Sequence, residues 1–197
     1  MIEDIDVVTE KVREYAKSAV SQSRFEHSVR TAETCVKYCK KFGLDEKKGY
    51  LAGIGHDMCK AMEPELLISI AVRDGKPFSD LEKMKPGLLH GRAAAVKLHE
   101  DFNVFEPDVI EAVANHTFGF PGMCDLSKIL YVADKIEPGR EHVTEEYLKS
   151  LKDLTLDQLA LSVLQDNINH LKKKNRAVAS ESEALLKWLE ERVNEKI

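Results

Sequence analysis

LAGIGHDMC, residues 51–59, is an apolar segment that is interrupted by one histidine and one aspartate. We predict that it lies inside a helix and that His56 and Asp57 are buried with it. An ionised aspartate is costly to bury unless a cation or another partner compensates its charge. Glycines at positions 53 and 55 leave room for a second helix, at a cost of roughly 1 kcal/mol each in helix propensity. The segment therefore predicts close helix packing around an acid that needs a compensating partner.

The rest of the chain shows the same helical period. Apolar residues recur at three- and four-residue spacing, and alternating runs typical of strands are absent. A turn at residues 74–75 and a loop at residues 117–122, rich in glycine and proline, break the pattern. We therefore predict an all-α protein. The expected helices cover about 8–19, 23–43 behind a capping box of Ser23 and Glu26, 45–58, 65–73, 86–98, 107–116, 126–136, 144–151, 156–173 and 181–195.

Composition narrows the class of protein. The chain has 197 residues, of which 43% are hydrophobic and 32% are charged, as in globular domains. Its net charge of −5 argues against nucleic-acid binding through the overall field. Apolar runs are too short to cross a membrane, and the first residues have no signal-peptide pattern, so we expect a cytoplasmic protein. We accordingly expect reduced, mostly buried thiols at Cys35, Cys39, Cys59 and Cys124.

Other histidines and one further aspartate occupy comparable places. His27 and His90 are expected near helix starts, and His116 at a helix end before the loop. Asp134 follows the apolar run ILYVA at residues 129–133. Imidazoles and carboxylates are ligands that divalent transition metals prefer, so these residues raise the hypothesis of a metal site. The remaining histidines lie in charged or turn segments, and we expect them to be structural: His99, His142 and His170.

These residues carry a resemblance to a known family. The order His27, His56-Asp57, Asp134 resembles the HD-domain phosphohydrolase superfamily, and His90 and His116 resemble its branch with two metals. Short motifs resemble more closely the YqeK family of symmetrical bis(5′-nucleosyl)-tetraphosphatases, which cleave diadenosine tetraphosphate into two ADP. The motifs are RFEH at 24–27, HDxxK at 56–60, HT at 116–117, PGM at 121–123, ADxIEPGR at 133–140 and LKKKN at 171–175. The resemblance runs from about residue 23 to 188 and implies an HD-domain bundle of about eight to ten helices.

The resemblance also implies a ligand set. It predicts two divalent metals that share the Asp57 carboxylate, with His27, His56, Asp57 and Asp134 on one metal and His90 and His116 on the other. Two cations about 3.5–4 Å apart can share a bridging hydroxide and neutralise phosphate oxygens during in-line attack. The resemblance favours iron, and manganese also fits these ligand types. Asp57 and Lys60 are the residues that we expect to act in catalysis.

Cationic and polar side chains near the ligands are candidates for substrate binding. Lys60, one turn after His56, could bind a phosphate as a point charge or be a solvated helix lysine. Arg24 and Arg140 could each contact a phosphate or pair with a nearby carboxylate. The rings at positions 118 and 120 stand where the family commonly has threonine and arginine, and they could stack on a base or fix the loop to the core. The predicted substrate-binding residues are Arg24, Lys60, Thr117, Phe120 and Arg140.

We expect one domain in three parts. Residues 1–22 form an N-terminal helix on the core, residues 23–140 form the HD metal-binding core, and residues 141–197 form C-terminal helices that complete it. The implied substrate is a dinucleoside polyphosphate or another nucleotide. Another HD-domain nucleotidase or phosphodiesterase is the alternative, and a non-catalytic nucleotide sensor is a further one. The lysines at 172–174 could serve a partner, although a charge run is usually a solvated face. The sequence does not set the oligomeric state.

Overall fold

The computed structural model describes residues 4–195, which contain eleven α-helices and no strand. This confirms the all-α prediction. Two short 3₁₀ turns, η1 at Val72–Asp74 and η2 at Pro86–Leu89, accompany the helices. No helix in this part of the chain has the length and apolarity that a membrane crossing requires. The helices are α1 Ile5–Ala19, α2 Gln22–Phe42, α3 Glu46–Gly55, α4 Pro64–Ala71, α5 Asp80–Met84, α6 His90–Asp101, α7 Pro107–Asn115, α8 Asp125–Ile136, α9 Glu145–Ser150, α10 Leu156–Lys173 and α11 Ser180–Asn194.

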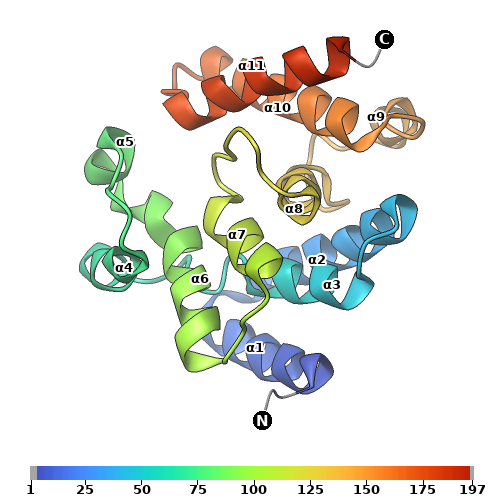
Figure 1. Cartoon of the computed structure of the whole chain (residues 1–197). Coiled ribbons are helices and arrows are strands. Elements are labelled where there is room, and N and C mark those ends of the chain that lie inside the picture. Colours follow the sequence, from blue (N-terminus) through green and yellow to red (C-terminus); the bar gives the residue numbers. More distant parts are fainter. Residues whose placement is uncertain (1–3, 196–197) are drawn as a thin grey trace.

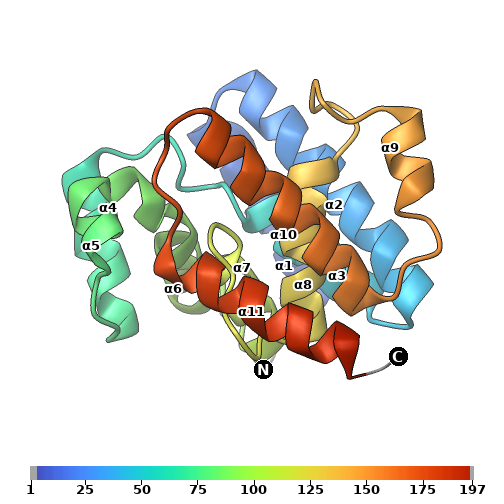
Figure 2. The same ribbon diagram turned by 90° about the horizontal axis from the view of Figure 1, so that it is seen from above.

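The helices form a bundle with a cover at one end. Helices α2, α3, α6, α7 and α8 make up its centre, and α1 packs against α3 at the end opposite to the C-terminal helices (Figure 1). Helices α10 and α11 lie across α8 and the loop that precedes it (Figure 2). Helices α4 and α5 form an arm on one side, beside α6. The space between the bundle and its cover is where the sequence-predicted site residues gather.

Most helix ends follow the local sequence signals. Asp45 caps α3 by accepting hydrogen bonds from two backbone amides, and Pro64 and Pro107 occupy the first turns of α4 and α7. Gly43 ends α2 with a φ of 72°, which a glycine adopts without strain. The predicted capping box of Ser23 was wrong, because Ser21 is the N-cap residue and its side chain accepts from the amide of residue 24.

Three further helix predictions need correction. The helix expected over 86–98 is a 3₁₀ turn at Pro86–Leu89 followed by α6 at His90–Asp101. Helix α3 ends at Gly55, so His56 is its C-cap residue and Asp57 lies in the turn that follows, not inside a helix. The sequence reading also missed α5, whose capping box pairs Ser79 with Glu82. Neighbouring residues inside a helix point about 100° apart. Because Asp57 lies in the turn after α3, its side chain and that of His56 can face the same point.

Helices α2 and α3 approach each other closely at a glycine. A Cβ atom built on Gly53 would lie 2.4 Å from the Cα atom and 2.8 Å from the backbone nitrogen of Ala32. Both residues are fully buried. Since backbone atoms cannot rotate away as a side chain can, only glycine at this position permits the observed helix spacing. This spacing sets the distance between His27 on α2 and His56 at the end of α3.

Polar contacts fix the C-terminal helices on the bundle. The buried Lys128 amine of α8 donates to Asp157 Oδ1 of α10 at 2.8 Å, and Arg192 of α11 donates to Asp157 Oδ2 at 3.1 Å. The Ser182 hydroxyl donates to the Phe118 carbonyl at 2.8 Å, which ties α11 to the loop before α8. All four cysteines are unpaired thiols, and three of them are buried, as expected.

We expect Gly53→Ala to lower the unfolding free energy of the metal-free protein by about 1–3 kcal/mol, because the added methyl group overpacks a buried helix contact. Gly87→Ala is the matched control, since a Cβ there meets no heavy atom within 4 Å. Chemical denaturation of both variants and the parent protein measures the difference. Equal stability of the Gly53 variant and the control would contradict this account of the helix contact.

Candidate metal centre

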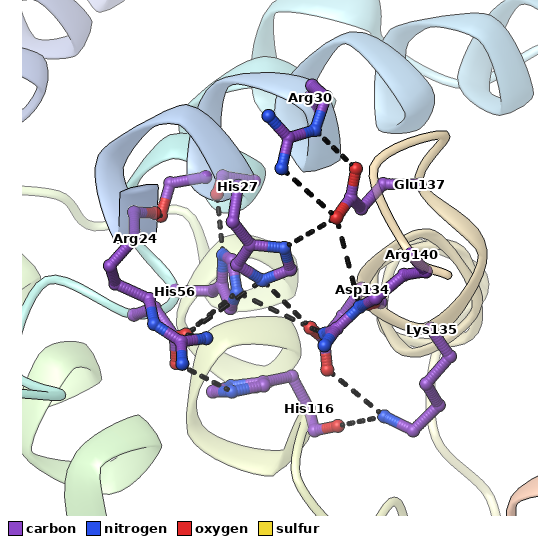
Figure 3. A network of polar contacts seen from close by, with 12 residues as sticks. Arg24, His27, Arg30, His56, His116, Asp134, Lys135, Glu137 and Arg140 are labelled. Carbon is purple, nitrogen blue, oxygen red and sulfur yellow. Dashed lines mark hydrogen bonds and ion pairs between the residues drawn. The ribbon is translucent and has the colours of Figure 1, made fainter. Parts of the chain in front are cut away.

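Six predicted ligand side chains converge at one end of the bundle. They come from helix ends and adjoining turns rather than from one element. His27 lies in the second turn of α2, His56 and Asp57 at and just after the end of α3, His90 at the start of α6, His116 at the end of α7, and Asp134 in the last turn of α8. All four histidines are at least 95% buried, and Asp57 is 3% exposed. Figure 3 shows His27, His56 and His116 directed at a common centre beside Asp134.

Asp57 lies between two pairs of histidines. Its Oδ1 atom is 3.0 Å from His90 Nε2 and 3.7 Å from His116 Nε2. Its Oδ2 atom is 3.7 Å from His56 Nε2 and 3.9 Å from His27 Nε2. Each oxygen of the carboxylate therefore faces a different histidine pair, which is the arrangement that a bridging ligand needs.

Asp134 closes the centre on the side of one histidine pair. Its Oδ1 atom is 3.1 Å from His27 Nε2 and 3.7 Å from His56 Nε2. Burial by itself raises the pKa of this carboxyl, but the neighbouring Lys135 amine holds the pKa well below its usual value. The pKa of Asp57 is also held well below its usual value, against the effect of burial. Both acids are therefore ionised at neutral pH.

Backbone carbonyls fix the orientation of three histidines. The Nδ1 atoms of His56, His90 and His116 lie 2.6, 2.8 and 2.8 Å from the carbonyl oxygens of the residues three positions earlier. A carbonyl only accepts, so each Nδ1 donates its hydrogen and each Nε2 keeps a lone pair directed inward. Burial lowers the pKa of His56 to about 3 and also lowers the pKa of His90, so both imidazoles are neutral.

A carboxylate orients the fourth histidine. His27 Nδ1 lies 3.1 Å from Oε1 of Glu137, which is 1% exposed. Arg30 Nε donates to Glu137 Oε2 at 2.6 Å, and the Gly139 amide donates to the same oxygen at 2.6 Å. Hydrogen bonds of this kind fix the ring and the tautomer of a metal-binding histidine and raise its basicity. Figure 3 shows this chain of contacts from Arg30 through Glu137 to His27.

These atoms fit divalent metal ions. His90 Nε2 and His116 Nε2 lie 3.1 Å apart, and Asp57 Oδ1 lies 3.0 Å from His90 Nε2, so two nitrogen lone pairs and a negative charge converge on one point. Nε2 of His27 and Nε2 of His56 are buried and make no hydrogen bond within residues 4–195. Two triads bring their ligand atoms within 4.8 Å of one another, His27-His56-Asp57 and Asp57-His90-His116. A divalent metal ion held by each triad would accept these lone pairs and offset their repulsion.

A cavity of about 790 Å³ opens next to the centre. Arg24 Nη1 donates to Asp57 Oδ2 at 2.9 Å, and Lys60 Nζ donates to His90 Nε2 at 3.1 Å. Arg140 Nη2 donates to Asp134 Oδ1 at 2.7 Å, and Lys135 Nζ lies 3.3 Å from Asp134 Oδ2. All four cations line the cavity, which makes it suited to an anionic ligand.

The other two predicted substrate residues differ in position. Thr117 lines the cavity, and its buried hydroxyl oxygen makes no hydrogen bond in the described part of the chain. Phe120 is half-buried and packs against the hydrophobic core, whereas Phe118 lines the cavity. Phe118, rather than Phe120, is therefore positioned to contact a ligand in the cavity.

Sequence reasoning missed the orienting role of Glu137 and the position of Lys135. Both lie within the motif at residues 133–140, so the motif itself was a signal, but their contacts depend on how the chain turns after α8. His142 and His170, which the sequence predicted to be structural, also line the cavity. They lie in segments that come near the site only because the C-terminal helices cover the bundle.

We expect Glu137→Gln to weaken metal binding about ten- to a hundredfold, because the neutral amide supports the His27 ring less well. Glu141→Gln, at an exposed position four residues on, is the control. Manganese titration of the metal-free proteins gives the affinities, and circular dichroism checks the fold. Unchanged manganese affinity in a folded Glu137 variant would refute the orienting role.

Comparison with known proteins agrees with this geometry. The family model described as HD domain matches residues 24–139. A symmetrical bis(5′-nucleosyl)-tetraphosphatase of Bacillus subtilis (strain 168) is 31% identical over 173 residues, which cover 88% of this chain and 92% of the relative. A protein of the same name from Staphylococcus aureus (strain NCTC 8325 / PS 47) is 32% identical over 77% of this chain and 76% of its own length.

A solved structure extends the comparison to the fold. The crystal structure of a predicted HD superfamily hydrolase involved in NAD metabolism, from Clostridium acetobutylicum, superposes with a TM-score of 0.85 at 28% identity, covering 93% of this chain and 97% of that one. The matched family model includes the whole set of converging histidines and aspartates. This chain belongs to the HD-domain family and is closely related to its symmetrical bis(5′-nucleosyl)-tetraphosphatases.

Proposed function

We propose that this protein is a metal-dependent hydrolase that cleaves diadenosine tetraphosphate symmetrically into two ADP. The observation that carries the proposal is the position of Asp57, whose two oxygens each face a separate pair of buried histidines. One carboxylate between two nitrogen pairs suits a pair of metal ions better than a single ion. The names of the relatives from Bacillus subtilis and Staphylococcus aureus support the choice of substrate.

The proposed ligands divide between two ions that share Asp57. His27, His56 and Asp134 would hold the first ion with one oxygen of Asp57, and His90 and His116 would hold the second with the other oxygen. Two divalent ions so held would neutralise phosphate charge and make a water molecule more acidic at neutral pH. Iron is the metal that we propose, with manganese as a substitute, because both accept imidazole and carboxylate ligands.

Cations of the chain would hold the phosphates beside this centre. Lys60, partly buried and 4.0 Å from Asp57 Oδ1, presents its amine to the cavity as a point charge. Arg24 and Arg140 contact Asp57 and Asp134, and their guanidinium groups have further hydrogens with which to bind phosphate oxygens. Thr117 offers a hydroxyl without a partner in the described residues. These groups would orient the tetraphosphate of the substrate for attack at its central bond. They would also stabilise the charge that develops on the reacting phosphate.

Phe118 is the residue that we propose for contact with a base. Its ring lines the cavity, and its carbonyl accepts from Ser182 of α11, which holds the loop in place. Stacking of a base on an aromatic ring is worth about 1–3 kcal/mol and is tolerant of base identity. The proposed site therefore binds adenine without strong selection against other bases.

The reaction adds one water molecule across the middle of the tetraphosphate. The water oxygen bonds to one of the two central phosphorus atoms, the bond from that phosphorus to the central bridging oxygen breaks, and each half leaves as ADP. After anaerobic purification and metal analysis, we expect two ions per chain and ADP as the product. In ¹⁸O water, one label should enter for every two ADP. AMP with ATP as products would contradict symmetrical cleavage, and one ion per chain would favour a different HD-domain nucleotide hydrolase.

We expect Asp57→Asn to keep the fold but to reduce turnover about a hundredfold or more, because the amide has no negative charge to share between two cations. Metal analysis, circular dichroism and the rate of ADP formation are measured on the same preparation. Near-normal turnover with full metal content would refute the bridging role of Asp57.

A further inference from the structure

The cavity continues from the metal centre to the C-terminal helices. Its far wall includes the last turn of α10 and the connection between α10 and α11, with Lys173 and Arg176 among the lining residues. Lys85, just after α5, lines the cavity from the neighbouring arm. Figures 1 and 2 both show the α10–α11 connection on the side of the molecule where α4 and α5 lie. Two segments far apart in the sequence, neither of which supplies a proposed metal ligand, thus line the same cavity.

The lining of the cavity is more basic than the protein as a whole. The full chain has a net charge of −5, with 34 acidic and 29 basic residues. The cavity instead has seven basic side chains and three acidic ones, and two of the three acids are the proposed ligands Asp57 and Asp134. The basic side chains are Arg24, Lys60, Lys85, Lys135, Arg140, Lys173 and Arg176.

The basic residues fall into two groups by their partners. The four beside the metal centre each lie within 4.0 Å of an oxygen of Asp57 or Asp134. The side chains of Lys85, Lys173 and Arg176 have no hydrogen bond or ion pair with any residue in the 4–195 range. Asp166, the remaining acid of the lining, already accepts a hydrogen bond from the Tyr147 hydroxyl at 2.8 Å. The side chains of Lys85, Lys173 and Arg176 therefore have no carboxylate in direct contact within residues 4–195.

The positive charge near this region also includes Lys174, which does not line the cavity. Lys174 lowers the pKa of His170, with smaller contributions from burial, from His142 and from the cations at positions 176 and 173. His170 itself lines the cavity. Because its side chain is exposed, the effect of neighbouring charges outweighs that of burial, as expected where positive charge is concentrated.

We propose that Lys85, Lys173 and Arg176 form a distal anion subsite that holds phosphate groups on the half of a dinucleoside polyphosphate that extends away from the metal centre. This assignment rests on the proposed function, and it adds a reason for the enzyme to prefer a long polyphosphate. A mononucleotide carries fewer phosphate groups with which to contact both groups of cations. A tetraphosphate cleaved at its centre has charged groups on both sides of the reacting atom, so it can use both.

The three consecutive lysines at the end of α10 differ in whether they line the cavity. The lysines at 172, 173 and 174 all lie at the C-terminal end of α10, where positive charge interacts favourably with the helix dipole. Lys173 lines the cavity, and its two neighbours do not. Arg176 follows the helix end, and its backbone amide donates to the Leu171 carbonyl at 2.9 Å, which holds the turn that carries it.

Two triple variants test the subsite with equal loss of charge. Lys85→Ala, Lys173→Ala and Arg176→Ala together remove the three cations of the cavity. Lys83→Ala, Lys172→Ala and Lys174→Ala remove three cations of the same two segments that do not line it. We expect the first variant to raise KM for diadenosine tetraphosphate about tenfold, as the loss of exposed charge contacts predicts, with kcat and metal content unchanged. The control variant should keep KM within about twofold.

Binding of inorganic tripolyphosphate to the metal-loaded proteins, measured by calorimetry, separates the subsite from the reaction. We expect the cavity variant to bind it about tenfold more weakly than the control. If the parent protein makes no ADP but the cavity variant loses tripolyphosphate affinity, the subsite stands and the proposed reaction is wrong. If the parent protein cleaves symmetrically while KM and affinity are the same in both variants, the subsite is refuted.

Discussion

The charge of Asp57 is the constraint on which the site depends. A buried carboxylate with a depressed pKa must be balanced by positive charge, and its neighbours are neutral imidazoles whose lone pairs point inward. The arginine and lysine beside it supply part of that balance from the cavity side. On the protein side, however, lone pairs face lone pairs across about 3 Å, as between His90 and His116. Divalent metal ions would satisfy this arrangement, which the surrounding fold holds in place.

The fold holds the site through helix ends. In three of the four histidines, a backbone carbonyl of the preceding turn accepts a hydrogen bond from the ring and fixes its orientation. Such a carbonyl is accessible to a side chain where a helix or 3₁₀ turn begins or ends. His27 lies inside α2, where the carbonyls are used by the helix itself, and it takes Glu137 instead. The close contact of α2 and α3 at Gly53 brings His27, inside α2, near His56 at the end of α3. A small change in helix spacing would therefore move the ligands of one ion relative to each other.

The C-terminal helices that cover the bundle extend the lining of the cavity. The HD-domain match ends at residue 139, yet the cavity is lined as far as Ser182 on α11. The proposed metal ligands come from the matched region, whereas several cavity residues come from α9, α10 and the connection to α11. In the proposed function, metal binding and substrate length would thus depend on different parts of one chain. Changes in the C-terminal helices would then alter which phosphate compound is bound while the proposed ligand set stays the same.

The sequence by itself determined the helical class, most helix boundaries and the set of candidate ligand residues, because periodicity, the positions of proline and glycine, and ionisable residues within apolar segments are local signals. It also identified Arg24, Lys60 and Arg140 as cations near the ligands, through their spacing from them. The tertiary structure decided where α3 ends, which oxygen of Asp57 faces which histidines, that Glu137 orients His27, and that Phe118 rather than Phe120 lines the cavity. It also decided that Lys173 and Arg176 face the same cavity as Lys85. These features depend on contacts between residues distant in sequence, and such contacts exist only once the helices have packed.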